Sequence, residues 1–259
     1  MELVLGITTY NRLPLLKKSI DGWNTTRNKN HGWTLIVADD GSADGTKKYL
    51  KNLKIEGVKI HIIFNDRRGV HHQSNQILKL CSTMDFDFGF KADDDITYLK
   101  SGWDSLYINA AEKTGFNHLC FYDTTWGKRR VELRNIQHSS GLLVCDAPPH
   151  DVQGAFWTFT KETIQKVGYF DLAGFSLCGY GHTDYTWRCC RAGFNSLSSP
   201  YDVKGSNNYI RLLLKGYYPA VQSEVRYKWN TPRQIKGKQA LLKQPRIYVP
   251  YNEVETRIE

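Results

Sequence analysis

Apolar runs and amphipathic segments alternate along the first hundred residues. Runs typical of buried strands occupy residues 3–9, 34–38, 58–64 and 86–92. Between them, apolar residues recur at helical spacing over 13–23, after Asp44, and over 69–81. This alternation predicts right-handed β-α-β units on a mostly parallel sheet flanked by helices, that is, an α/β fold.

The pattern loosens after Lys113. It still predicts a strand at 119–122, a hairpin from 131–136 and 142–144, a strand at 154–160, and helices at 161–167 and 183–192. Beyond Pro200 the chain is basic, aromatic and less periodic. We therefore expect one domain over residues 1–200, with two halves, 1–100 and 101–200. Residues 201–259 would form an extension packed on the same domain.

Polar clusters follow each of the four predicted strands of the first half. They are Thr8-Thr9-Tyr10-Asn11, Asp39-Asp40, Asn65-Asp66-Arg67-Arg68 and Asp93-Asp94-Asp95. Ligands of open parallel sheets bind beyond the carboxyl ends of the strands, so these clusters should meet at one binding site.

The three consecutive aspartates are the most informative of these clusters. Crowded carboxylates are unfavourable unless a cation lies among them, and Mg²⁺ or Mn²⁺ prefers carboxylate and phosphate oxygens. Asp93, Asp94 and Asp95 therefore suggest a metal–diphosphate site. The alternative is a solvated acidic turn.

The composition narrows the class of partner. A net charge of +9 favours anionic partners, and 13% aromatic residues suit sugar rings and nucleobases as well as an ordinary core. A nucleic-acid-binding motif is absent from the sequence, so we expect no nucleic-acid partner. Six cysteines without repeated C-x-x-C spacing indicate a reduced protein. We expect no signal peptide, no transmembrane segment and a cytoplasmic location, and leave peripheral contact with a membrane open.

Five ordered segments resemble the family 2 type of GT-A fold glycosyltransferases. They are ITTYNR (7–12), VADDGSADGT (37–46), KADDDI (91–96), GAFWTFTKETIQKVGYFD (154–171) and GYGHTDYTWRCCRAGF (179–194). The resemblance covers roughly residues 2–195 and implies a Rossmann-like central sheet with a smaller acceptor-side sheet. It also implies that residues 1–100 are the nucleotide-binding half and residues 101–200 the acceptor or catalytic half. It also implies transfer of a sugar from a nucleoside-diphosphate sugar, with a UDP-sugar favoured.

By this resemblance, the first two segments hold the nucleotide. Thr8 and Tyr10 would line the base pocket, Arg12 would lie with them, and Asp39 or Asp40 would accept a hydrogen bond from the base. A simple turn with capping by Ser42 and Asp44 is the alternative for the acidic pair. Arg67 and Arg68 could bind phosphate oxygens bidentately or form a solvated basic turn.

The resemblance also divides the aspartates by role. Asp93 would reach the ribose and contribute to the metal site, Asp94 would assist or orient, and Asp95 would bind Mn²⁺ or Mg²⁺. A third protein ligand is not obvious.

The catalytic base departs from the family pattern. When the last segment is aligned on Arg188, Gly181 and His182 replace the usual Glu-Asp pair, and Asp184 matches the acid that follows. We favour Asp184 as the base, keep His182 as the competing candidate, and regard Asp151 as the next. For His182 the alternatives are acceptor binding or helix capping.

The sequence leaves the roles of two further sets of residues open. Four aromatic side chains could stack on sugars but could equally pack in a core: Trp126, Trp157, Tyr180 and Trp187. The basic stretch 226–243 could close over the diphosphate, bind an anionic acceptor, or keep the protein in solution.

The sequence as a whole predicts a metal-dependent inverting glycosyltransferase that acts on a hydroxyl of a glycan or related acceptor. The alternative is a nucleotide-sugar or carbohydrate-binding protein of the same fold that has lost turnover, because the Glu-Asp pair is missing at Gly181-His182.

Overall fold

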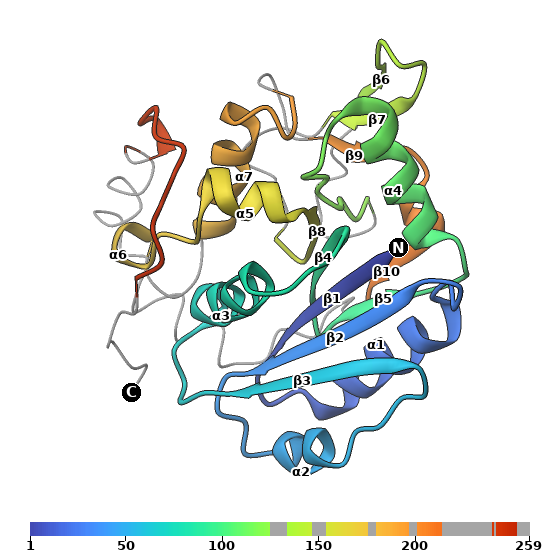
Figure 1. Cartoon of the computed structure of the whole chain (residues 1–259), viewed down its shortest axis with the longest axis vertical. Coiled ribbons are helices and arrows are strands. Elements are labelled where there is room, and N and C mark those ends of the chain that lie inside the picture. The colour runs from blue at the N-terminus through green and yellow to red at the C-terminus, as the bar shows by residue number, and fades with distance from the viewer. Residues whose placement is uncertain are drawn as a thin grey trace.

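The computed structural model describes residues 1–124, 134–146, 154–175, 180–196, 201–213, 240 and 242–252. A five-stranded sheet in the order β3-β2-β1-β4-β8 forms its centre (Figure 1). Four strands are parallel and the edge strand β8 is antiparallel: β1 (Glu2–Thr9), β2 (Gly32–Asp39), β3 (Val58–Phe64), β4 (Phe88–Asp93) and β8 (Phe156–Phe159). The predicted mostly parallel α/β sheet is confirmed.

Helices cover both faces of this sheet. One layer packs under Leu5, Val37 and Phe90 and consists of α1 (Leu13–Thr26), α2 (Thr46–Lys51) and α4 (Trp103–Thr114). The other packs over Val4, Ile36 and Trp157 and consists of α3 (Val70–Ser82), α5 (Lys161–Val167) and α7 (Gly181–Arg191). Both faces are buried, which explains why the parallel strands read as continuous apolar runs.

Smaller antiparallel sheets lie toward the second half of the chain. One has the order β6-β7-β9, from Arg134–Gln137, Leu143–Asp146 and Tyr201–Val203. The other pairs β5 (Ile96–Tyr98) with β10 (Ile210–Leu212). The predicted hairpin is confirmed as β6 and β7, with Gly141 at a φ of +81° in the turn.

The expected strand at 119–122 is wrong. The pairing with β8 is limited to one bridge, Cys120 with Trp157, and the backbone N–H of Leu119 donates to the Thr158 hydroxyl instead of to a carbonyl of that strand. The pattern also did not predict α4, the short helix α6 (Leu172–Phe175), or the three-residue strands. A helix such as α4, with buried Trp, Tyr, Ile and Ala and few polar residues at its buried face, shows weak periodicity.

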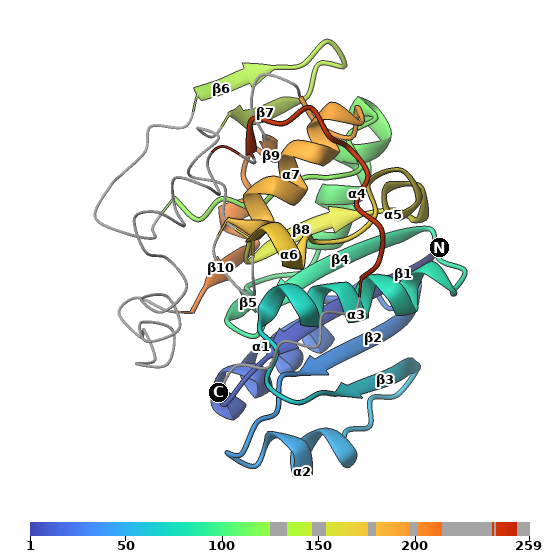
Figure 2. The same cartoon turned by 90° about the vertical axis from the view of Figure 1, so that its left-hand side faces the viewer.

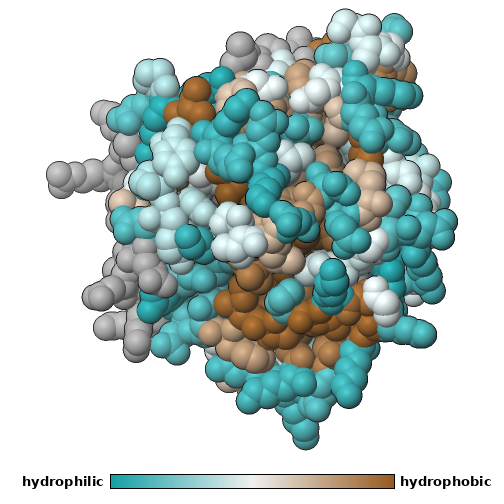
Figure 3. All heavy atoms as spheres, viewed as in Figure 1, coloured by the Kyte–Doolittle hydropathy of each residue, from teal (hydrophilic) through white to brown (hydrophobic). Residues whose placement is uncertain are grey.

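The edge strand β3 leaves part of the sheet open to solvent. Apolar side chains gather over β2 and β3 in the view of Figure 3, and Phe64 is 39% exposed. Among the described residues, no helix is both long and apolar enough to pass through a bilayer. The five described cysteines are unpaired and buried, as the reduced state predicts.

Candidate active site

The carboxyl ends of β1, β2 and β4 meet in register. Thr8 pairs with Asp93 of β4, and Thr9 pairs with Asp39 of β2. The next residues continue this contact, because the Asp40 N–H donates to the Thr9 carbonyl at 2.9 Å and the Asn65 N–H donates to the Asp39 carbonyl at 3.0 Å. The four polar clusters predicted from the sequence therefore lie at one edge of the sheet.

The first strand holds the aspartate cluster through its two threonines. The Thr8 hydroxyl donates to Asp93 Oδ1 at 2.9 Å, and the Thr9 hydroxyl donates to Asp94 Oδ2 at 2.8 Å. The ammonium group of Lys91, a side chain only 3% exposed, also contacts Asp93 Oδ1. One oxygen of Asp93 is thus engaged on the protein side, while the side chain stays 29% exposed.

Arg12 lies among the aspartates. Its Nη1 donates to Asp94 Oδ1 at 3.0 Å and to Asp95 Oδ2 at 3.1 Å. A buried guanidinium placed there compensates part of the carboxylate charge. We expected Arg12 to bind the nucleotide, but the structure shows its described contacts with the metal-motif carboxylates instead.

Asp95 has an unsatisfied oxygen. Asp95 Oδ1 is buried and has no hydrogen-bond partner among the described residues. Burial, together with the neighbouring Asp94 and Asp93, raises the pKa of Asp95 above its ordinary range, and burial raises that of Asp94 as well. A buried unpaired carboxylate oxygen is costly, and a hard divalent cation would satisfy it.

The two aspartates after β2 have different surroundings. Asp40 accepts three hydrogen bonds that tie it to the start of α3: from the Arg68 N–H at 2.6 Å, the Gly69 N–H at 2.8 Å and Gln73 Nε2 at 2.6 Å. Burial raises the pKa of Asp40 to about 6, and these donors oppose that rise. The carboxylate of Asp39 is fully buried and accepts from the Ser42 N–H, at 3.3 and 3.2 Å. Among the described residues it has fewer donors than Asp40 and therefore keeps acceptor capacity.

Side chains of the β1 and β3 ends come together beside these aspartates. The guanidinium of Arg67 lies over the Tyr10 ring, 4.6 Å from its centroid. The Asn11 side chain accepts from the Ala43 N–H at 2.7 Å, which joins the first two motif segments. For Arg68, the described contact with Asp40 comes from its backbone rather than its guanidinium.

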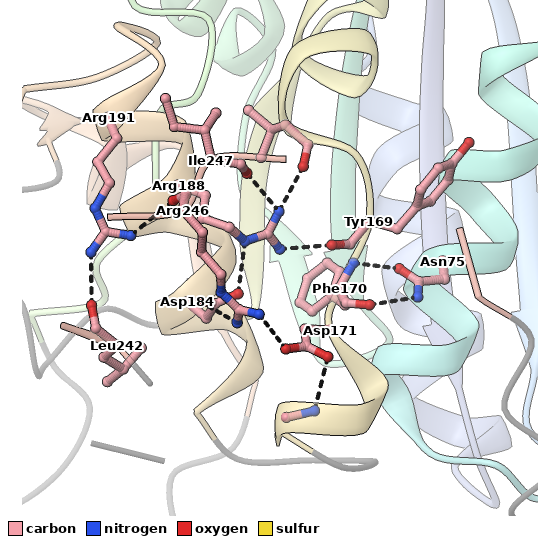
Figure 4. A network of polar contacts seen from close by, with 12 residues as sticks. Asn75, Tyr169, Phe170, Asp171, Asp184, Arg188, Arg191, Leu242, Arg246 and Ile247 are labelled. Atoms are coloured by element: carbon pink, nitrogen blue, oxygen red, sulfur yellow. Dashed lines mark hydrogen bonds and ion pairs between the residues drawn. The ribbon is translucent and has the colours of Figure 1, made fainter. Parts of the chain in front are cut away.

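The two candidate bases lie in the first turn of α7, in unlike environments, and Figure 4 shows the contacts of Asp184. Asp184 is 1% exposed, and its two oxygens accept from Arg188 Nε at 2.7 Å and Arg246 Nη2 at 2.9 Å. A general base must reach the proton that it removes. A carboxylate buried between two arginines does not meet this requirement, so the geometry favours His182 over Asp184.

His182 lies beside the strand that pairs with the metal motif. A Cβ added to Gly154 would come within 2.8 Å of His182 Cβ, so the histidine packs directly on the backbone there. The next residue, Ala155, accepts a hydrogen bond from the Asp93 N–H at 2.7 Å. Unlike Asp184, His182 is partly exposed.

Some candidates fall elsewhere. Trp157 is 2% exposed and packs against Phe170 and Tyr185, so it belongs to the core. Tyr180 and Trp187 are partly exposed. Asp151, Trp126 and most of the basic stretch 226–243 lie outside the described residues.

The comparisons with known proteins agree with this geometry. The model of glycosyl transferase family 2 matches residues 5–168. The chain belongs to this family. An uncharacterized glycosyltransferase, R363, of Acanthamoeba polyphaga mimivirus is 25% identical over 220 residues, which cover 82% of this chain and 81% of the relative.

Solved structures share the fold of this family 2 glycosyltransferase. The mannosyltransferase PcManGT from Pyrobaculum calidifontis, in complex with GDP-Man and Mn²⁺, has a TM-score of 0.62 at 13% identity, over 93% of this chain and 69% of its own. TarS of S. aureus has a TM-score of 0.61 at 12% identity, over 93% of this chain and 39% of its own. GalNAc-T7 with UDP, GalNAc and Mn²⁺ has a TM-score of 0.60 at 12% identity, over 90% of this chain and 49% of its own.

These similarities establish the GT-A fold. This chain spans less than two thirds of the length of TarS and of GalNAc-T7. The substrates named for those proteins are not assigned to this chain.

Two basic residues of this region, Lys91 and Arg246, are not among the site residues that the sequence pattern predicts. A basic residue two positions before the aspartates on the same strand face was a usable signal for Lys91, since alternate residues of a strand share a face. The sequence offers no comparable signal for Arg246, because its partners Asp171 and Asp184 are 75 and 62 residues away.

Proposed function

We propose that this protein is a metal-dependent inverting glycosyltransferase that moves a sugar from a nucleoside-diphosphate sugar to a hydroxyl of a glycan or related acceptor. The observation that carries the proposal is the arrangement at the end of β4. Three aspartates meet the threonines of β1 there, and Asp95 Oδ1 is buried without a partner. A divalent ion that binds together with a nucleotide-sugar would supply positive charge to both the carboxylates and the diphosphate.

Asp95 and Asp93 are the residues that would hold Mn²⁺ or Mg²⁺. Asp94 is held by Thr9 and Arg12 and would orient its neighbours. Within the described ranges, no group of three or more His, Cys, Asp or Glu side chains is arranged to hold an ion alone. Diphosphate oxygens would therefore complete the coordination, as is usual for Mg²⁺ in nucleotide sites. When bound, the ion would stabilise the negative charge of the departing nucleoside diphosphate.

The nucleotide would lie across the ends of β1 and β2. Asp39 keeps acceptor capacity and would receive a hydrogen bond from the base, whereas the Asp40 oxygens are already occupied. Tyr10 offers an aromatic face, and Arg67 beside it offers positive charge. An acidic acceptor at this position suits the N–H of uracil, so we favour a UDP-sugar.

The proton of the acceptor hydroxyl would pass to His182. A single displacement forms the bond between the acceptor oxygen and the anomeric carbon while the bond from that carbon to the diphosphate oxygen breaks. The acceptor proton moves to the imidazole, and the electron pair leaves with the nucleoside diphosphate. Only one displacement occurs, so the anomeric configuration inverts.

The second candidate function is donor binding without turnover. It is favoured by the absence of an acid at Gly181 and His182 and by the burial of Asp184 between arginines.

The two aspartates of β2 give the first testable difference. Asp40→Asn should lower the free energy of unfolding by about 1.5–3 kcal/mol, because an amide replaces a charged acceptor of three hydrogen bonds. Asp39→Asn should instead weaken nucleotide binding and leave the requirement for metal unchanged. Urea unfolding and calorimetric titration of UDP measure the two effects. Equal nucleotide affinity in wild type and Asp39→Asn would remove Asp39 from the base pocket.

Metal binding should depend on pH. The metal-free Asp94 and Asp95 carboxyls have raised pKa values, so they bind protons that an ion must displace. We expect Mn²⁺ affinity to rise as pH increases from about 5 to 8, with proton release on binding. Calorimetric titration in two buffers of different ionisation enthalpy measures both. A Mn²⁺ affinity that is constant over this range, without proton release, would contradict the assignment.

A thermal-shift screen tests the proposed function. A ligand that binds only the folded state raises the melting temperature. We expect at least one of the UDP-, GDP- and dTDP-sugars to raise it with Mn²⁺ present and to do so less without Mn²⁺. Metal-dependent release of free sugar or transfer to an acceptor then distinguishes the enzyme from the binding protein.

A further inference from the structure

Residues 242–252 run along α7 and α5 and reach α3 (Figure 2). Not one of these eleven residues is buried. The segment and the turn before α6 also leave a cavity of about 250 Å³ between Asp171, Arg246 and Tyr248. Apolar burial is therefore a weak source of attachment for this segment, and its polar contacts must supply most of it.

A backbone bridge fixes the middle of the segment. The Val249 N–H donates to the Val167 carbonyl at 3.1 Å, and the Tyr169 N–H donates to the Val249 carbonyl at 3.0 Å. Gly168 between them has a φ of +77°, and a Cβ there would lie 1.9 Å from the Val249 oxygen. Glycine at this position permits the two chains to approach.

Two arginines of α7 hold carbonyl groups of the same segment (Figure 4). Arg191 donates to the Leu242 carbonyl at 2.7 Å and to the Arg246 carbonyl at 3.2 Å. Arg188, which is fully buried, donates to the Ile247 carbonyl at 3.3 Å. The last turns of α7 thus bind backbone carbonyl groups of the segment from one side.

Ion pairs with Arg246 connect the segment to the first turn of α7. Arg246 Nη2 binds Asp184 at 2.9 Å, and its Nη1 binds Asp171 before α6. Arg188 binds the other oxygen of Asp184 at 2.7 Å. Two arginines and two aspartates balance their charges, and Asp184 at the centre is 1% exposed.

We infer that Asp184 is a positioning residue: its carboxylate clamps the C-terminal segment to the turn of α7 that carries His182. The inference deepens the proposed function, on which its catalytic consequence rests. Asp184 is two residues from His182, so the clamp restrains the helical turn from which the imidazole reaches the acceptor. Residues 242–252 thereby help to hold His182 in position.

Amide hydrogen exchange tests the clamp without any substrate. In Asp184→Asn and in Arg246→Met, exchange of the Val249 and Tyr169 amides should become at least about tenfold faster, because local opening costs less free energy. The effects of the two changes should not add up fully in the double variant, since both remove the ion pair between Asp184 and Arg246. Lys243→Met, an exposed charge of the same segment, is the matched control and should leave both amides unchanged.

Turnover of the donor separates positioning from base catalysis. Substitution of a clamp residue should lower kcat and leave the acidic limb of the plot of kcat/KM against pH at the same pH. Arg246→Met should therefore have the same effect as Asp184→Asn. Unchanged amide exchange in Arg246→Met would overturn the clamp. Loss of the acidic limb in Asp184→Asn with wild-type exchange would make Asp184 the base. If Asp184→Asn does not fold, Arg246→Met and Arg246→Lys still decide, because Arg246→Lys keeps the charge and should restore part of the protection.

The exchange measurement is independent of activity. A wild-type protein without any turnover would refute the proposed enzyme, and the amides would still report whether the clamp exists.

Discussion

Asp95→Asn should abolish metal-dependent donor binding and leave the fold intact. Asp95 Oδ1 is buried and has no partner, so it is the carboxylate oxygen best placed to meet an ion. Removing an outer-shell partner of a metal costs about 10–100-fold in affinity, and removing a direct carboxylate ligand should cost more than about 100-fold. Calorimetric titration of Mn²⁺ and UDP into wild type and variant measures the loss.

Asp95→Asn should lower the affinity for Mn²⁺ without lowering the stability of the metal-free protein. Three crowded carboxylates repel one another in the metal-free protein, and burial already raises the pKa of Asp95. We therefore expect the metal-free variant to unfold at the wild-type denaturant concentration or above it. Asp21→Asn, an exposed aspartate of α1, is the control and should change neither quantity. Wild-type Mn²⁺ affinity in Asp95→Asn would refute the metal assignment.

His182→Ala should lower kcat by about two to four orders of magnitude, which is the usual contribution of a general base. The donor is held by the other half of the site, at the ends of β1, β2 and β4, so UDP affinity with Mn²⁺ should stay at the wild-type value. Initial rates at saturating donor, together with calorimetric titration, measure the two quantities.

The exposed His61 of β3 provides the control for this variant, and His61→Ala should keep wild-type turnover. If His182→Ala turns over at the wild-type rate, the base lies elsewhere, and Asp151 becomes the residue to test. A higher acceptor KM with unchanged kcat would instead assign His182 to acceptor binding.

The parallel half of the fold was predictable from local pattern. Strands β1, β2 and β4 are buried on both faces, and this produces apolar runs that end where the polar site residues begin. The edge strand β3 instead carries partly buried and exposed residues. The positions of Thr8, Asp39 and Asp93 at one edge followed from that topology, and the register of the strands confirms their proximity.

Two residues of the site make contacts that a local pattern does not predict, because their partners are distant in sequence. Arg12 belongs to a motif that suggests nucleotide binding, but its contacts with Asp94 and Asp95 depend on residues more than 80 positions away. Likewise, Asp184 resembles a base by alignment, yet the approach of Arg246 from the C-terminal segment buries it. Arg188 and Asp184 stand at i and i+4 of α7 and form an ion pair at 2.7 Å, a contact that helical spacing permits.

The most direct test of the central claim is the release of nucleoside diphosphate from a panel of UDP-, GDP- and dTDP-sugars, with Mn²⁺ or with EDTA, in wild type and Asp95→Asn. Our account predicts release from at least one donor that requires Mn²⁺, stops with EDTA and is absent in Asp95→Asn. Release at the same rate in EDTA, or in the Asp95 variant, would contradict it, and so would a folded wild-type protein that neither binds nor cleaves any of these donors.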